Sequence, residues 1–317
     1  MERFATYSAL INERVAKWVA SLPHGTLYAP MAYLLGSPAK RLRPIAMLMC
    51  CEAYGKDPAS VLDEALGIEL FHTFTLMHDD IMDEAPLRRG RPTVHTEWSV
   101  NTAILSGDAM LVKAYQLMAH DPAVLGIFSE CALSVCEGQQ LDMELAEKDD
   151  ASPEAYLEMI RLKTAVLLAC SMRIGAIRGG ASVTDAGHLE RFGEQIGLAF
   201  QLRDDLLDAF GDPDKVGKQR GGDLKAGKRT WLLIHALEKS HAAGDRSLVD
   251  ELARPAADRD VARMLDVMEQ LDVHAAATRE VERHTTSAMV ALEKVALPLE
   301  RKAPLLDLAT YLLERAY

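Results

Sequence analysis

The sequence has no long uncharged apolar run, and this absence argues against a membrane-spanning chain. Such a span needs about 18 or more consecutive apolar residues, and no segment of the 317-residue chain approaches that length. The N-terminal stretch MERFATYSALINERV also lacks the basic-then-apolar pattern of a secretory signal. We therefore expect a cytoplasmic protein with no stable membrane insertion.

Positive charge is also scarce, and the cysteines have no metal-binding or redox spacing. The 35 lysines and arginines face 47 aspartates and glutamates, a formal net charge of -12, whereas nucleic-acid binding needs a basic surface. We expect no nucleic-acid partner, and any anionic ligand must be held by a local basic cluster. The five cysteines are odd in number and lack CxxC spacing, which predicts mostly buried, reduced thiols, as is usual in cytoplasm.

The alternating pattern of a half-buried β-strand is likewise missing. The long segments from Val61, Val124 and Leu189 repeat their apolar residues with the period of an α-helix. Ser60 followed by Asp63 predicts a capping box at the start of the first of these helices. No segment is long or biased enough to be an interdomain linker. The pattern predicts an all-α protein in which residues 1–317 form a single domain.

The sequence does contain two clusters of acidic residues at predicted helix ends, each followed by basic residues. HDDIMD precedes LRRGRPT, and RDDLLD later precedes GKQRGG. On a helix, Asp79 and Asp83 lie one turn apart and about 40° apart around the axis, so both can face one point. The same holds for Asp204 and Asp208. Like charges repel at this spacing, and carboxylates without His or Cys favour Mg²⁺, which also binds waters and substrate phosphates.

One such motif could equally be a solvated helix face, but two copies, each before a basic turn, favour a metal site. Several basic residues of these turns and of AKRLRP can clamp phosphate oxygens by charge-assisted hydrogen bonds. They are Lys40, Arg41, Arg43, Arg88, Arg89, Lys218 and Lys228. Acids for a metal and bases for phosphate together predict a diphosphate site.

Two other motif interpretations, a phosphate-binding loop and a di-iron site, lack residues that those sites require. GDLKAGKR from Gly222 nearly matches the phosphate-binding loop GxxxxGK[ST], but Arg229 stands where the hydroxyl should be and no strand is predicted before it. Glu69 and His72 form the ExxH pair of helical di-iron proteins, which require a second such pair that we do not find. A histidine satisfied in the helix, or bound to phosphate, is the better interpretation.

In this order the motifs resemble those of the trans-isoprenyl diphosphate synthases, also called polyprenyl synthetases. The resemblance runs from Lys40 to Thr230 and comprises KRLRP, HDDIMDEAPLRRG, LSGDAML, EGQQLD, RLKTAVLLA, FQLRDDLLD and GKQRGGDLKAGKRT. It implies an isoprenoid-synthase-type helical bundle around a deep central cavity, and a homodimer. It also implies Mg²⁺-dependent, head-to-tail 1'-4 condensation of isopentenyl diphosphate with an allylic diphosphate (dimethylallyl, geranyl or farnesyl).

The resemblance also implies a role for each matching residue. Three Mg²⁺ ions per active site would be held by Asp79, Asp83, Asp204 and, through water, Asp208, with Asp80 in support. Isopentenyl diphosphate would bind at Lys40, Arg43, His72 and Arg89. The allylic diphosphate would bind at Arg88, Lys163, Lys218 and Lys228, with Gln139 and Asp142 near the metals. Catalysis would rest on the metal-binding Asp79 and Asp204 and on three residues that face the carbocation: Lys163, Thr164 and Gln201.

The residues before Asp79 bear on product length. If the growing tail runs back along the helix, Phe74 lies about 7.5 Å deeper, where its ring can stop elongation. An aromatic there, beside the small Thr75, resembles synthases of C20 geranylgeranyl diphosphate. Phe71 and other helices could set a different depth, which leaves C15 farnesyl and C25 or longer products open. Phe74 could also be plain core packing.

Two alternative functions are less consistent with the motifs, and one segment departs from the usual family sequence. A class I terpene cyclase normally carries an Asn/Ser/Glu metal triad where this chain has DDLLD. A non-catalytic partner subunit typically loses one aspartate motif, and both are intact here. Pro38 and Ala39 replace two usual glycines, and the stiffer turn could present Lys40 differently.

Overall fold

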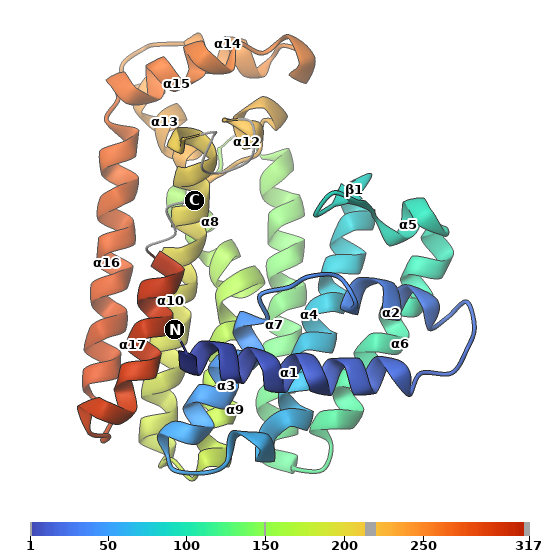
Figure 1. Ribbon diagram of the computed structural model, residues 1–317. Helices are drawn as coiled ribbons and strands as arrows, with labels where there is room; N and C mark the ends of the chain where they lie inside the picture. Colours follow the sequence, from blue (N-terminus) through green and yellow to red (C-terminus); the bar gives the residue numbers. More distant parts are fainter. Residues whose placement is uncertain (1, 149, 213–219, 314–317) are drawn as a thin grey trace. The chain divides into compact units, whose positions relative to one another are not determined.

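The structure of the protein is a computed structural model that describes residues 2–148, 150–212 and 220–313 (Figure 1). Over this range it is predominantly helical with almost no β-strand, which confirms the predicted all-α class. Within the same range no helix combines the length and apolarity needed to cross a membrane. The five cysteines form no disulfide, and Cys136 is exposed whereas the other four are buried.

The helices and strands follow one another with short connections. The α-helices are α1 (Glu2–Ala20), α2 (Ala29–Leu35), α3 (Leu42–Ala53), α4 (Leu62–Met82), α5 (Val94–Glu97), α6 (Val100–Met118), α7 (Pro122–Glu147), α8 (Pro153–Ile160), α9 (Val166–Gly179), α10 (Val183–Phe210), α12 (Gly222–Ala226), α13 (Trp231–Ala242), α14 (Ser247–Leu252), α15 (Val261–Gln270), α16 (Val273–Glu293) and α17 (Leu299–Leu313). Short 3-10 turns form η1 (Pro58–Val61) and η3 (Ala256–Asp258), and η2 (Arg161–Ala165) is a turn of π-helix. Strands β1 (Leu87–Arg88) and β2 (Arg91–Pro92) form an antiparallel hairpin.

The chain divides into two compact units. The first comprises residues 1–130, 170–187 and 297–305, and the second comprises residues 131–169, 188–296 and 306–317. Helices α7, α9, α10 and α17 have residues in both units. A single domain over residues 1–317 stays a prediction.

In the first unit α4 and α6 pack closely because glycines stand where they meet. A Cβ atom at Gly107 of α6 would lie 2.2 Å from Nε2 of His78, and one at Gly67 of α4 would lie 2.8 Å from Cε of Met118. A larger residue at Gly107 would displace the His78 ring, whereas at Gly67 the flexible end of Met118 could move aside. The glycine in the LSGDAML motif therefore makes room for the histidine that directly precedes the first aspartate pair.

In the second unit the apolar stripe of α10 fixes where its aspartates point. Leu198, Leu202 and Leu206 belong to one buried core cluster with residues of α8, α13, α15 and α16. At 100° per residue, Asp204 and Asp208 lie on a different side of the helix from this stripe. Asp205, by contrast, lies on the same side as the leucines, and its carboxylate is therefore buried.

Candidate active site

The first aspartate motif ends in the β-hairpin that follows α4 (Figure 1). The hairpin pairs Arg88 with Arg91 around the two-residue loop Arg89–Gly90. Both loop residues have positive φ, 53° and 75°, which is the conformation of a type I′ turn and favours Gly. The sequence had indicated no strand, and the hairpin corrects this, because two residues per strand are too few for an alternating pattern to appear.

Arg88 turns back from the hairpin onto α4. Its Nε lies 2.9 Å from both carboxylate oxygens of Asp80, and its Nη2 lies 2.8 Å from Oδ1 of Asp80 and 3.7 Å from Oδ2 of Asp79. Asp80 is buried, Asp79 is half-buried and Asp83 is exposed. Asp80 thus holds the guanidinium beside Asp79. The basic end of DDIMDEAPLRR therefore forms ion pairs with the acidic start of the same motif.

A second basic cluster of the first unit forms at the start of α3. Nη1 of Arg43 lies 3.2 Å from Nε2 of His72, and because a guanidinium only donates, Nε2 is the acceptor. Burial, followed by the charges of nearby arginines, holds the pKa of His72 well below its ordinary value. Arg89 donates from Nη1 to the carbonyl of Pro38 at 2.9 Å. The hairpin is therefore bonded to the turn that precedes Lys40.

Arg41 does not belong to this cluster, which corrects the expectation from AKRLRP. Its guanidinium is buried and donates to Oδ1 of Asn12 at 2.7 Å, Oε1 of Glu69 at 2.6 Å and the carbonyl of Leu35 at 2.8 Å. With φ of 47°, Arg41 is a left-handed residue at the N-cap of α3. It turns into the protein while Lys40 stays exposed. Glu69 is accordingly the partner of a buried arginine and not a metal ligand.

Phe74 lies about 1.4 turns before Asp79 on α4. It is 9% exposed, and its ring centre is 5.6 Å from that of Phe71 and 4.7 Å from the ring of His78. Oγ1 of Thr75 donates to the carbonyl of His72 at 2.8 Å. The aromatic rings form a continuous row along the helix. A chain-length role for Phe71, Phe74 and Thr75 stays a prediction.

In the second unit, Lys163 and Thr164 lie on the π-turn η2 between α8 and α9. Turns of π-helix are frequent at functional sites. A Cβ atom at Gly138 of α7 would lie only 2.3 Å from the backbone nitrogen of Lys163. One turn further along α7, Asp142 accepts from Nζ of Lys163 at 2.5 Å. The EGQQLD motif therefore holds the π-turn by a backbone approach and by an ion pair.

The end of α10 is bonded to the turn that carries Lys228. Oδ2 of Asp208 accepts from the backbone nitrogen of Asp223 at 2.9 Å, and the Asp223 carbonyl accepts from the backbone nitrogen of Lys228 at 2.9 Å. Burial alone would lower the pKa of Lys228, but nearby carboxylates raise it above its ordinary value; they are Asp223, Asp142 and Asp205. The Lys228 ammonium group is therefore stabilised in its charged form by the surrounding carboxylates.

Sequence reasoning missed two residues of this unit, Asp205 and Tyr156. Tyr156 donates from its hydroxyl to Oδ2 of Asp205 at 2.6 Å, and Gln201 donates from Nε2 to Oδ1 at 3.1 Å. Burial raises the pKa of Asp205 to about 7, against the opposing effect of these two bonds. A signal was available, because position 205 falls on the helix side of Leu198 and Leu202, where an acid needs a partner.

The oxygen donors present fit Mg²⁺. In the described part of the chain, no group of three or more His, Cys, Asp or Glu side chains is placed to hold a metal ion. Mg²⁺ does not require one, since it is usually held by one or two carboxylates together with waters and substrate phosphates. The aspartate pairs 79/83 and 204/208 supply such carboxylates. Gln139 lies half-buried on α7, whereas Lys218 lies outside the described residues.

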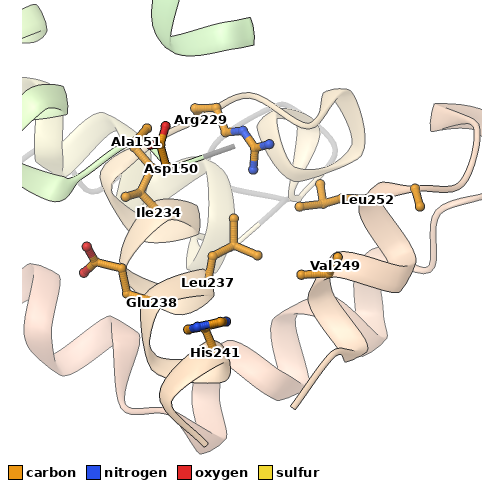
Figure 2. A pocket seen from close by; sticks show the side chains of 10 residues that line it. Asp150, Ala151, Arg229, Ile234, Leu237, Glu238, His241, Val249 and Leu252 are labelled. Carbon is orange, nitrogen blue, oxygen red and sulfur yellow. The ribbon is translucent and has the colours of Figure 1, made fainter. Parts of the chain in front are cut away.

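The second unit also has a pocket that is separate from these residues (Figure 2). Its volume is about 720 Å³. It is lined by Asp150, Ala151, Arg229, Ile234, Leu237, Glu238, His241, Val249, Leu252 and Ala253. Figure 2 shows the α13 side chains on one side of the opening and those of α14 on the other. No residue assigned to substrate or metal is in its lining, so we do not assign the pocket to the reaction.

Comparison with known proteins identifies the family. Residues 24–271 match the model of the family described as polyprenyl synthetase. The chain is similar to the short chain isoprenyl diphosphate synthase of Methanothermobacter thermautotrophicus, at 35% identity over 100% of this chain and 99% of the relative. The geranylfarnesyl diphosphate synthase of Natronomonas pharaonis is 38% identical over 73% of this chain and 74% of the relative. A crystal structure of a geranylgeranyl pyrophosphate synthase matches with a TM-score of 0.93 and 38% identity, covering 99% of both chains. The chain belongs to the polyprenyl synthetase family and is a trans-prenyltransferase.

Proposed function

We propose that the protein condenses isopentenyl diphosphate with an allylic diphosphate to give C20 geranylgeranyl diphosphate. One observation carries the proposal: in each unit, a carboxylate from one of the family motifs is paired with a basic side chain assigned to the allylic diphosphate. Arg88 is bonded to Asp80 in the first unit, and Lys163 is bonded to Asp142 in the second. Both aspartate motifs are intact, which disfavours a terpene cyclase or a non-catalytic subunit.

Isopentenyl diphosphate would bind at Lys40, Arg43, His72 and Arg89. In neutral His72 the contact with Arg43 leaves Nε2 as acceptor, so the ring proton is on Nδ1 and can be donated to a phosphate oxygen. Arg43 and Arg89 are already oriented by His72 and Pro38. Oriented guanidinium groups suit bidentate phosphate binding.

The allylic diphosphate would bind through Mg²⁺ to the metal-binding aspartates, with further contacts from basic side chains. The acids are Asp79, Asp83, Asp204 and Asp208, and the bases are Arg88, Lys163, Lys218 and Lys228. Bound Mg²⁺ would neutralise charge on the leaving diphosphate. Arg88 and Lys228 would add fixed positive charge from the hairpin and from the turn after α12.

The proposed condensation has three steps: loss of diphosphate from the allylic substrate, formation of the new carbon–carbon bond, and loss of a proton. The allylic C1–O bond breaks and its electron pair leaves with diphosphate. The double bond of isopentenyl diphosphate then attacks C1, forming the new C1–C4 bond, and a proton from C2 passes to an oxygen of the released diphosphate. Neutral oxygen dipoles of Lys163, Thr164 and Gln201 would stabilise the intermediate cation.

The C20 product and the homodimer rest on separate features. Phe74 lies deeper than Asp79 along α4 and supports a C20 limit, with C15 and C25 or longer products as alternatives.

Large apolar side chains along α6 are 40% to 60% exposed: Val100, Ile104, Leu105 and Val112. Several large apolar side chains exposed on one helix favour a protein interface, and we propose that a second copy of the chain covers them.

Substitution of the aspartates tests the site. We expect Asp79→Ala or Asp204→Ala to lower turnover by several orders of magnitude, because each would remove a metal ligand, while the helical circular dichroism is retained. EDTA should abolish the activity and Mg²⁺ restore it. Full activity in EDTA, or unfolding of both variants, would show that these acids are structural.

A further inference from the structure

The contact with Asp205 fixes which way the amide of Gln201 points. The atom that Gln201 places 3.1 Å from Oδ1 of Asp205 is its amide nitrogen Nε2, which donates to the carboxylate. The amide oxygen Oε1 is then directed away from Asp205. An oxygen dipole, and not a pair of N–H donors, is what a neighbouring carbocation requires.

Asp205 is in turn held from another element. The hydroxyl of Tyr156, on α8, donates to Oδ2 of Asp205 at 2.6 Å, and this bond is buried. Tyr156 and Asp205 are 2% and 4% exposed. Since α8 continues directly into the π-turn that carries Lys163 and Thr164, the bond also ties that turn to α10.

We infer that Tyr156 and Asp205 are positioning residues, which hold Gln201 so that its amide oxygen is presented to the allylic cation. The inference rests on the proposed role of Gln201 in the prenyl transfer. A tyrosine that only satisfied a buried carboxylate would contribute to stability, but it would not act through Gln201. The two possibilities differ in how substitutions at the two positions combine.

A double-mutant cycle between Tyr156 and Gln201 separates these possibilities. We expect Gln201→Leu to lower kcat about 100-fold, as is typical for loss of one group that stabilises transition-state charge. Tyr156→Phe should lower kcat about tenfold in the natural background and less than about twofold in the Gln201→Leu background, because residues that act as a unit are not additive. The KM for isopentenyl diphosphate should be unchanged in all three variants.

A second variant covers the case in which Tyr156→Phe does not fold. Asp205→Asn keeps the shape but lets the new amide donate to Gln201, which favours the opposite orientation of the Gln201 amide. We expect this variant to lose at least as much kcat as Gln201→Leu, and the double variant to return to the level of Gln201→Leu alone. Tyr7→Phe, which removes a buried hydroxyl bonded to Glu52 in the first unit, is the matched control and should keep kcat.

The outcomes are distinguishable. If Tyr156→Phe lowers kcat by the same factor in both backgrounds, and Asp205→Asn adds to Gln201→Leu, the positioning inference is overturned while the prenyltransferase function stands. If Gln201→Leu itself keeps full kcat, the proposed role of Gln201 is wrong and the inference falls with it.

Discussion

Adjacent basic residues in KRLRP have opposite roles. Arg41 is buried against Glu69, whereas Lys40 is exposed. Removing one partner of a buried ion pair leaves the other charge uncompensated, so Arg41→Ala should lower the free energy of unfolding by about 3–5 kcal/mol. Lys40→Ala should change it by less than about 0.5 kcal/mol but raise the KM for isopentenyl diphosphate. Urea unfolding and steady-state kinetics of both variants provide the test, and equal stability losses would contradict it.

His284 predicts how stability depends on pH. Arg283 donates to its Nε2 at 2.9 Å, so the ring proton is on Nδ1, which donates to Oε1 of Gln195 at 2.8 Å. Burial, followed by the charge of Arg283, lowers the pKa of His284 to about 4. The unfolded chain therefore binds more protons between this pKa and about 6.5, and stability falls as pH drops through that window.

Replacing the histidine should remove this sensitivity. His284→Gln can keep one donor and one acceptor without titrating. We expect the loss of unfolding free energy between pH 7 and pH 4 to shrink by about 2–3 kcal/mol relative to the natural chain. Urea denaturation at a series of pH values measures it. An unchanged pH dependence would mean that the ring is already charged in the folded state.

Side-chain chemistry was easier to predict from the sequence than side-chain direction. The bases of KRLRP were recognisable as a cluster. Which arginine turns inward was not, because it depends on the left-handed conformation of Arg41 and on Asn12 and Glu69, which are distant in sequence. Asp205 could have been found, since the helix period alone places it beside core leucines.

The helices were predicted well by periodicity, but their ends and irregular turns were not. The capping box proposed at Ser60 and Asp63 is wrong: Asp57 accepts from the backbone nitrogen of Ala59 to begin η1, and Asp63 is paired with Arg14. The I′ hairpin and the π-turn also escaped prediction. Each is only a few residues long and depends on contacts with other elements, so no period can reveal it.

The approach of α7 to the π-turn gives a test at a single glycine. At Gly138 a Cβ atom would lie 2.3 Å from the backbone of Lys163, whereas at Gly126 of the same helix nothing lies within 4 Å. Gly138→Ala should cost about 1–3 kcal/mol of stability through overpacking and should lower kcat by displacing Lys163 and Thr164.

Gly126→Ala is the matched control. It should stabilise the helix by about 0.5–1 kcal/mol and keep kcat. Thermal unfolding and kinetics of the two variants decide the matter. If Gly138→Ala behaved like Gly126→Ala, the close packing of α7 on η2 would have no functional consequence.

For the whole molecule, the all-α class followed from the absence of alternating patterns and the length of the periodic segments. The division into two compact units did not, because the units interleave along the chain and share helices, with no linker in the sequence to mark them. The family was predicted by motif order alone, and the comparisons confirm it.

Product length is a property of the whole molecule, and Phe74 is the proposed limit to elongation. We expect Phe74→Ala to yield products longer by one or more C5 units while catalysis is retained, because removing the ring lets the tail extend further along α4. Chromatography of dephosphorylated products measures this. If Phe71→Ala lengthens the product and Phe74→Ala does not, the limit lies one turn deeper.

The central claim is that this chain joins isopentenyl diphosphate to an allylic primer and stops at C20. Purified protein incubated with Mg²⁺, labelled isopentenyl diphosphate and C5, C10 or C15 allylic diphosphates, followed by chromatography of the dephosphorylated products, tests it most directly. We predict a main product of C20 from these primers and none when EDTA replaces Mg²⁺. Folded protein that elongates none of the three primers would contradict the claim, and a main product of another length would contradict the C20 assignment alone.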